Sequence, residues 1–123
     1  MSIKNQFMQI KVLKSKIHRA IVTDANLDYE GSIAIDESLI EAAGLCPYEK
    51  VHILDITNGS RLETYVIKAP SGSKSICING AAAHLVKPDD TVIILSYCAI
   101  NQKDSIGYKP NIIKVNHQNE IID

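Results

Sequence analysis

The stretch DYEGSIAID, residues 28–36, places a glycine directly before a serine, at Gly31 and Ser32. A serine hydroxyl can attack the carbonyl carbon of the residue before it through a five-membered ring, which turns the amide into an ester. Glycine helps because it has no Cβ to obstruct the attack and tolerates unusual backbone dihedral angles. Elimination of the ester would leave dehydroalanine, and hydrolysis would convert that into a pyruvoyl group. A Gly-Ser pair taken alone favours the simpler interpretation of a turn.

Other kinds of reactive site find little support in the sequence. The four histidines are far apart, and no pair of them has the spacing of metal ligands: His18, His52, His84 and His117. No P-loop, GxGxxG or GxSxG motif is present. We therefore expect no metal and no nucleotide-phosphate cradle.

Composition narrows the class of protein further. With 123 residues and a net charge of -1, the chain fits a single domain without the basic surface that nucleic-acid or anionic-membrane binding needs. The three cysteines, Cys46, Cys77 and Cys98, are an odd number without CxxC spacing, which favours a reducing cytoplasm. The longest apolar run, TVIILSYCAI, is too short to span a bilayer, and no signal peptide is recognisable. Whether residues 1–7 are native stays open.

The elements that must position Ser32 are mostly short strands. Alternating apolar residues predict strands over 8–15 and 17–24, and Asn58-Gly59 predicts a hairpin between strands at 50–57 and 61–68. The stretch 36–45 predicts a helix, which Asp36 begins and Gly44 ends. Further strands are expected at 75–78, 91–100 and 111–115. Many short strands around one small helix predict a mainly β fold, a closed or nearly closed barrel.

Five stretches in this order resemble the aspartate 1-decarboxylase family: KIHRAIVT, DYEGSIAID, AAG, TNGSRLETYVI and NGAAAHLV. The resemblance runs from about Met8 to about Val115. It implies that residues 1–123 form one double-psi β-barrel with one or two short helices. It also implies a homotetramer with active sites at subunit boundaries.

The same resemblance makes the Gly31-Ser32 bond the maturation site. Self-cleavage would give a β-chain, residues 1–31, and an α-chain, residues 32–123, headed by a pyruvoyl group derived from Ser32. That covalent ketone would form a Schiff base with L-aspartate and support its decarboxylation to β-alanine and CO2, for pantothenate and coenzyme A biosynthesis. No pyridoxal phosphate or metal would be required. Whether an accessory protein assists maturation stays open.

Roles for other residues also follow from the family motifs. Tyr65 matches the proton donor, Thr64 and Asn79 match residues that act in maturation and substrate binding, and Arg61 and Lys16 match residues that bind the substrate carboxylates. In a regular strand Arg61 and Tyr65 share one face and Thr64 points to the other. All three can serve one site only if the pocket wraps around the strand or borrows from a neighbouring subunit.

The NGAAAH motif adds a stretch of small residues. Gly80, Ala81 and Ala82 would let backbone amides approach the substrate. The roles of three further residues stay open: His18, Tyr29 and His84.

Two other functions remain as alternatives. A non-catalytic double-psi barrel that acts as a binding module would keep the strand pattern, but it need not keep Gly31-Ser32, Arg61, Thr64 and Tyr65 together. A pyruvoyl decarboxylase of another acidic amino acid is the second alternative, since charge alone does not exclude glutamate. The joint presence of these residues favours the aspartate enzyme.

Overall fold

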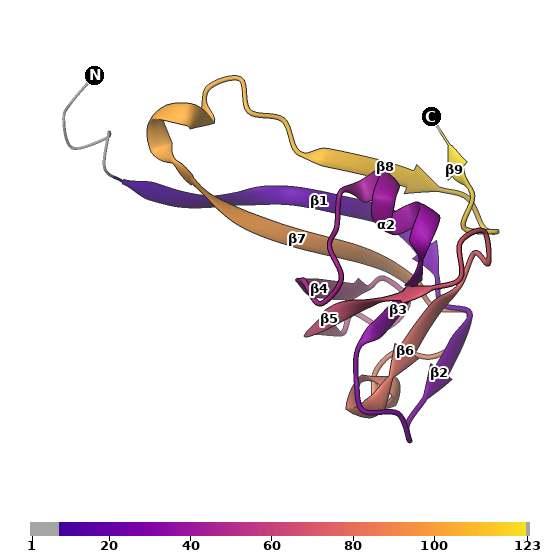
Figure 1. Ribbon diagram of the computed structural model, residues 1–123. Helices are drawn as coiled ribbons and strands as arrows, with labels where there is room; N and C mark the ends of the chain where they lie inside the picture. The colour runs from indigo at the N-terminus through magenta and orange to yellow at the C-terminus, as the bar shows by residue number, and fades with distance from the viewer. Residues whose placement is uncertain (1–7, 123) are drawn as a thin grey trace.

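The computed structural model describes residues 8–122, and strands dominate them (Figure 1). The strands are β1 (Gln9–Ile21), β2 (Asp24–Asn26), β3 (Ile33–Asp36), β4 (Lys50–Asp55), β5 (Arg61–Ala69), β6 (Ile76–Asn79), β7 (Thr91–Asn101), β8 (Asn111–Val115) and β9 (Ile121–Ile122). The helical elements are α2 (Glu37–Ala43) and two 3₁₀ helices, η1 (Gly80–His84) and η2 (Gln102–Ser105).

Strand pairing closes most of this sheet into a barrel. The strand order is β2-β6-β3-β5-β4-β7-β1-β8-β9. β2 follows β1 almost directly in the chain, and the Thr23 N–H donates to Ile76 O at 2.8 Å. The sheet therefore returns on itself, from β7 through β1 and β2 to β6. This confirms the predicted mainly β-barrel, and the parallel pairs β2–β6 and β3–β5 among antiparallel neighbours agree with a double-psi topology.

The inside of the barrel is filled with β-branched residues. Alternation along β4 and β5 directs every second side chain inward, and the largest fully buried side chains are mostly isoleucine and valine. Each such residue stabilises the fold by roughly 1.5–3 kcal/mol relative to an exposed one. The core thus fixes the strands whose ends carry the candidate site.

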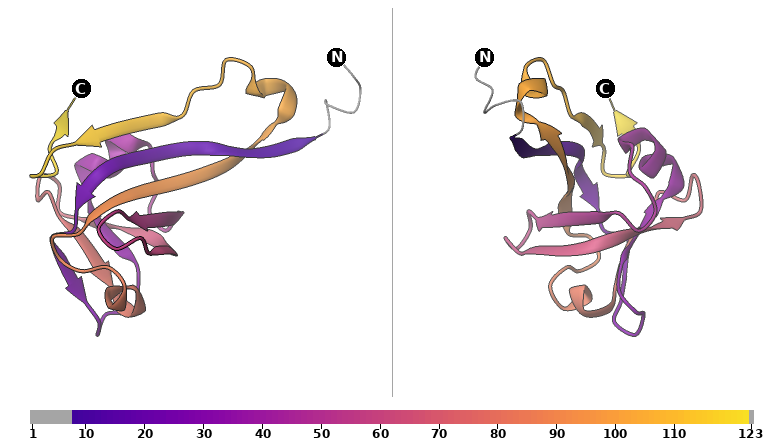
Figure 2. Two further views of the ribbon diagram at one scale, coloured as in Figure 1. Left: turned by 180° about the vertical axis from the view of Figure 1, so that it is seen from behind. Right: turned by 60° about the vertical axis from the view of Figure 1, so that its left-hand side comes forward.

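β1 differs from the sequence prediction, which was wrong in dividing it into two strands. It runs without interruption over 13 residues and pairs with β7, with register shifts between Leu13 and Ser15 and between Ile17 and Ala20. Arg19, inside the second shift, has a φ of 66°. Such β-bulges break the alternation of apolar and polar residues without ending the strand. The paired β1 and β7 extend past the barrel as a long twisted ribbon (Figure 2).

The predicted helix and hairpin are both confirmed. Asp36 accepts a hydrogen bond from the Ser38 N–H at 2.8 Å and begins α2, and Gly44, with a φ of 71°, ends it. β4 and β5 form the antiparallel hairpin around Asn58-Gly59. This hairpin sets the register of β5 and so the position of Tyr65.

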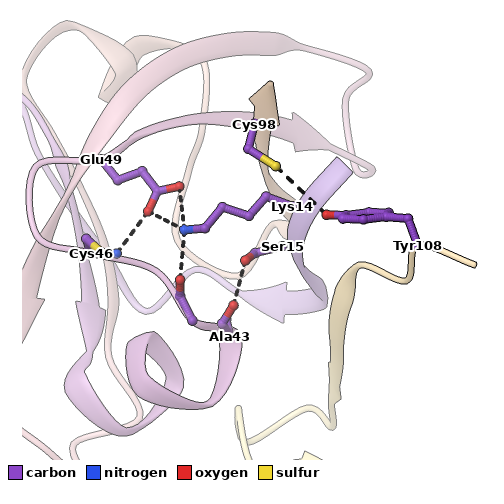
Figure 3. A network of polar contacts seen from close by, with 8 residues as sticks. Lys14, Ser15, Ala43, Cys46, Glu49, Cys98 and Tyr108 are labelled. Atoms are coloured by element: carbon purple, nitrogen blue, oxygen red, sulfur yellow. Dashed lines mark hydrogen bonds and ion pairs between the residues drawn. The ribbon is translucent and has the colours of Figure 1, made fainter. Parts of the chain in front are cut away.

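A polar network ties the end of α2 to β1 (Figure 3). Lys14 Nζ donates to Gly44 O at 2.8 Å and to Glu49 Oε1 at 2.8 Å, and the Cys46 N–H donates to the same carboxylate. Burial opposes ionisation of Glu49, but the hydrogen bonds from Lys14 and Cys46 outweigh it and lower its pKa. The network holds the segment between α2 and β4, which carries Tyr48.

Candidate active site

The Gly31-Ser32 bond lies at the entry to β3, in an unusual backbone conformation. Gly31 has a φ of 119° and Ser32 a φ of 91°, and Ser32 is only 1% exposed. Glycine adopts such values freely, but for serine they cost about 1–3 kcal/mol. The bond that the sequence singles out is therefore buried and strained on its serine side.

Asn79 contacts Ser32 twice. β6 runs antiparallel to β3, so Asn79, the last residue of β6, lies beside Ser32, the residue directly before β3. The Asn79 backbone N–H donates to Ser32 O at 3.0 Å, and Asn79 Nδ2 donates to Ser32 Oγ at 3.1 Å. Cys77 Sγ donates in turn to Asn79 Oδ1 at 3.3 Å. Asn79 therefore contacts both the backbone carbonyl and the hydroxyl of Ser32.

Gly80 packs against the backbone of the Gly31 segment. A Cβ on Gly80 would lie 2.8 Å from both Gly31 Cα and Gly31 N, and 3.0 Å from Tyr29 O. Gly80 also has a φ of 74°. Only glycine fits this position without a shift of η1 or of the strained bond.

Tyr65 reaches the same bond from β5. β3 and β5 are parallel, with Ile33 beside Val66, so the residues just before them are neighbours. Tyr65 Oη lies 3.9 Å from the position that a Cβ on Gly31 would take. A cavity of about 430 Å³ opens there, and seven residues line it: Asp28, Tyr29, Glu30, Ser32, Tyr48, Tyr65 and Ile67.

Tyr48 is a lining residue that sequence reasoning missed. It has a φ of 68° and is largely exposed, and its ring lies 6.4 Å from the Tyr65 ring, centroid to centroid. Nothing in the local pattern PYEK indicates this contact, because it depends on how the segment after α2 crosses β5. Cys77 was also missed, although its position two residues before Asn79 places both on one face of β6.

Arg61 and Thr64 follow the alternation of β5. Arg61 and Tyr65 project from the outer face and Thr64 faces the barrel, where it is half-buried. Arg61 lines a different cavity, of about 520 Å³, whose other charged residues are Lys11, Lys50 and Glu63. Arg61 and Tyr65 are four positions apart on β5, about 13 Å along an extended strand.

The remaining predicted residues are spread around the barrel. Lys16 is half-buried in β1, between Leu95 of β7 and Ile112 of β8. Ala81 and Ala82 lie in η1 directly after Gly80, with Ala81 exposed. Burial, followed by the nearby charges of Lys16, Arg19 and Lys114, lowers the pKa of His18, and exposed His84 closes η1.

The charge of the serine cavity does not suit a dianion by itself. Asp28 and Glu30 line it, and among its described lining residues none is basic. Arg61 lies instead in the other cavity, with Lys11, Lys50 and Glu63. The Gly31-Ser32 bond and Arg61 therefore lie at two separate places in this chain.

Two kinds of feature are absent from residues 8–122. No helix there has the length and apolar character needed to cross a membrane. Within the same residues, no group of three or more His, Cys, Asp or Glu side chains is placed to hold a metal ion.

Fold and site together define a small β-barrel protein with a strained Gly-Ser bond, whose serine is buried, beside a cavity. The family model described as aspartate decarboxylase matches residues 8–122, nearly the whole chain. The chain belongs to this family.

Curated relatives agree over most of their length. An aspartate 1-decarboxylase of Dehalococcoides mccartyi is 54% identical over 89% of this chain and 89% of its own. An aspartate 1-decarboxylase of Caldicellulosiruptor bescii is 54% identical over 94% of this chain and 90% of its own. One of Corynebacterium efficiens is 57% identical over 90% of this chain and 82% of its own. A computationally designed protein, msDPBB_sym2, has 19% identity and a TM-score of 0.44 over 71% of this chain and 99% of its own, too slight a likeness to support a conclusion.

Proposed function

We propose that this protein is a self-processing, pyruvoyl-dependent decarboxylase that converts L-aspartate to β-alanine and CO2 in the cytoplasm, for pantothenate biosynthesis. The observation that carries the proposal is the strained Gly31-Ser32 bond, with Asn79 bonded to both oxygens of Ser32 and Tyr65 beside Gly31. Family membership supports the substrate and the reaction.

The geometry favours the acyl shift that begins cleavage, in which an ester replaces the amide before elimination separates the two fragments. Ser32 Oγ attacks the Gly31 carbonyl carbon, the C–N bond breaks as the C–O bond forms, and the hydroxyl proton passes to the Ser32 nitrogen. Nδ2 of Asn79 donates to Oγ and stabilises charge that builds there as the proton leaves. Backbone strain at Ser32 raises the energy of the uncut chain and so lowers the barrier.

The residues around Ser32 fit a pyruvoyl group at this position. Its ketone would supply the electron acceptor that decarboxylation requires. Gly31 leaves space for a substrate amine to approach, since only Tyr65 Oη lies within 4 Å of the position of a Cβ there, and the Tyr65 phenol would deliver a proton to the substrate α-carbon. Tyr29 and Tyr48 line the same cavity.

We propose further that the working unit is a homotetramer with sites between copies. The serine cavity contains two carboxylates, whereas the Arg61 cavity contains Arg61, Lys11 and Lys50 beside one carboxylate, Glu63, so a second copy that places these basic groups over Ser32 would supply the charge that aspartate needs. Arg61 and Lys16 are the groups assigned to the substrate carboxylates.

Intact mass and activity test both proposals. Wild-type protein should separate into residues 1–31 and 32–123, whereas Ser32→Ala should stay uncut and inactive; an active preparation of uncut chain would refute self-processing. Co-expression of Ser32→Ala with Arg61→Ala should restore part of the activity that each lacks alone. If the co-expressed chains stayed inactive although mass spectrometry showed hybrid tetramers, a site shared between copies would be refuted.

Glutamate decarboxylation is the competing activity. A measured preference for glutamate over aspartate would replace the proposed substrate, and cleavage without decarboxylation of either would favour the binding-module alternative.

A further inference from the structure

Cys77 contacts Asn79, whose side chain donates to Ser32 Oγ. It lies two residues before Asn79 on β6, and its Sγ donates to Asn79 Oδ1 at 3.3 Å. The other end of the same amide, Nδ2, donates to Ser32 Oγ at 3.1 Å. An asparagine amide has a donor end and an acceptor end, so a partner on one end decides what the other end presents.

We propose that Cys77 is a positioning residue, whose thiol fixes the Asn79 amide with its N–H group directed at Ser32 Oγ. This inference rests on the proposed self-cleavage at Ser32. Asn79 is the group that touches the reacting atom, and Cys77 acts through it.

Orientation of the amide matters because its two ends have opposite effects on the serine. With Nδ2 facing Oγ, the serine proton is free to leave, and the developing negative charge is stabilised. If the amide were rotated by 180°, Oδ1 would face Ser32 Oγ and accept a hydrogen bond from the hydroxyl. The partial negative charge of Oδ1 would then oppose negative charge on Oγ. A group that donates to Oδ1 disfavours this half-turn.

The thiol is suited to be that donor. Burial, and then the nearby Asp24 carboxylate, raise the pKa of Cys77, so it keeps its proton at neutral pH. Its backbone is paired on both sides, with Ala34 of β3 and Asp24 of β2. This pairing holds Cys77 in place, and a change of side chain should leave the strand intact.

Three substitutions separate hydrogen bonding from packing. Cys77→Ser keeps a donor, Cys77→Val keeps bulk without a donor, and Cys77→Ala removes both. The measurement is the rate at which newly synthesised chain converts to the 1–31 and 32–123 fragments, followed by intact mass. The same substitutions in a Ser32→Ala chain, which cannot be cut, report by unfolding midpoint whether the fold persists.

The expected result is cleavage of Cys77→Ser within about twofold of wild type and roughly 3–10-fold slower cleavage of Cys77→Val and Cys77→Ala, the effect of one neutral hydrogen bond. If Cys77→Val were cleaved at the wild-type rate, or if Cys77→Ser and Cys77→Val lost cleavage rate equally, the role of Cys77 would be refuted. The proposed self-cleavage at Ser32 would still stand. An uncut wild-type chain would overturn the proposed function, and this inference with it.

Discussion

Replacing Gly80 by alanine is the sharpest perturbation of the candidate site that leaves every polar group in place. The added Cβ would lie 2.8 Å from Gly31 Cα and N and 3.0 Å from Tyr29 O. All three are backbone atoms, which cannot rotate away as a side chain can. Either η1 or the Gly31-Ser32 bond must therefore move.

Two costs contribute to the expected loss of stability. A φ of 74° costs alanine about 1–2 kcal/mol, and forcing a methyl group into a packed site costs about 1–3 kcal/mol more. Gly107→Ala is the matched control, because Gly107 has a φ of 79° but an added Cβ there meets nothing within 4 Å. The difference between the two variants isolates the contact with Gly31, at about 1–3 kcal/mol.

Urea unfolding in a Ser32→Ala background, at one protein concentration, measures this difference on a single uncut chain. In the Ser32 background, cleavage of Gly80→Ala should slow by about tenfold or more, since about 1.4 kcal/mol corresponds to a factor of ten in rate. Gly107→Ala should be cut at the wild-type rate. Equal unfolding free energies for the two variants, or normal cleavage of Gly80→Ala, would refute the reasoning.

Two further predictions concern Tyr65 and Asp55. Tyr65→Phe should be cut normally but should lose about 10²–10⁴-fold in kcat for aspartate with little change in KM, measured as β-alanine formation; normal turnover would make Tyr65 a wall residue only. Burial and the neighbouring Asp90 raise the pKa of Asp55 from 3.8 to about 6. The folded state therefore binds that proton more tightly than the unfolded chain, and stability should fall as pH rises from about 4 to about 6. Asp55→Asn should weaken this pH dependence and raise the free energy of unfolding at pH 7 by up to about 3 kcal/mol. Urea unfolding with an unchanged pH dependence in this variant would contradict the prediction.

Local patterns were enough to predict much of the fold. The helix, its caps at Asp36 and Gly44 and the Asn58-Gly59 hairpin were all predictable, because capping and turn formation depend on residues close in sequence. The alternation of β5, with Thr64 facing the other way from Arg61 and Tyr65, followed from the period of a strand. β1 was harder because its bulges shift the side-chain pattern without ending the strand.

The sequence by itself predicted cleavage of the Gly31-Ser32 bond and, through family motifs, the candidate residues of a site around it. Only the tertiary structure decided that Asn79 bonds Ser32, that Gly80 abuts Gly31 and that Tyr48 faces Tyr65. It also separated Arg61 from the serine cavity. These contacts join segments that meet through the parallel pairing of β3 with β5 and the antiparallel pairing of β3 with β6. Such long-range pairing is set by burial of the whole core, and no local stretch of sequence encodes it.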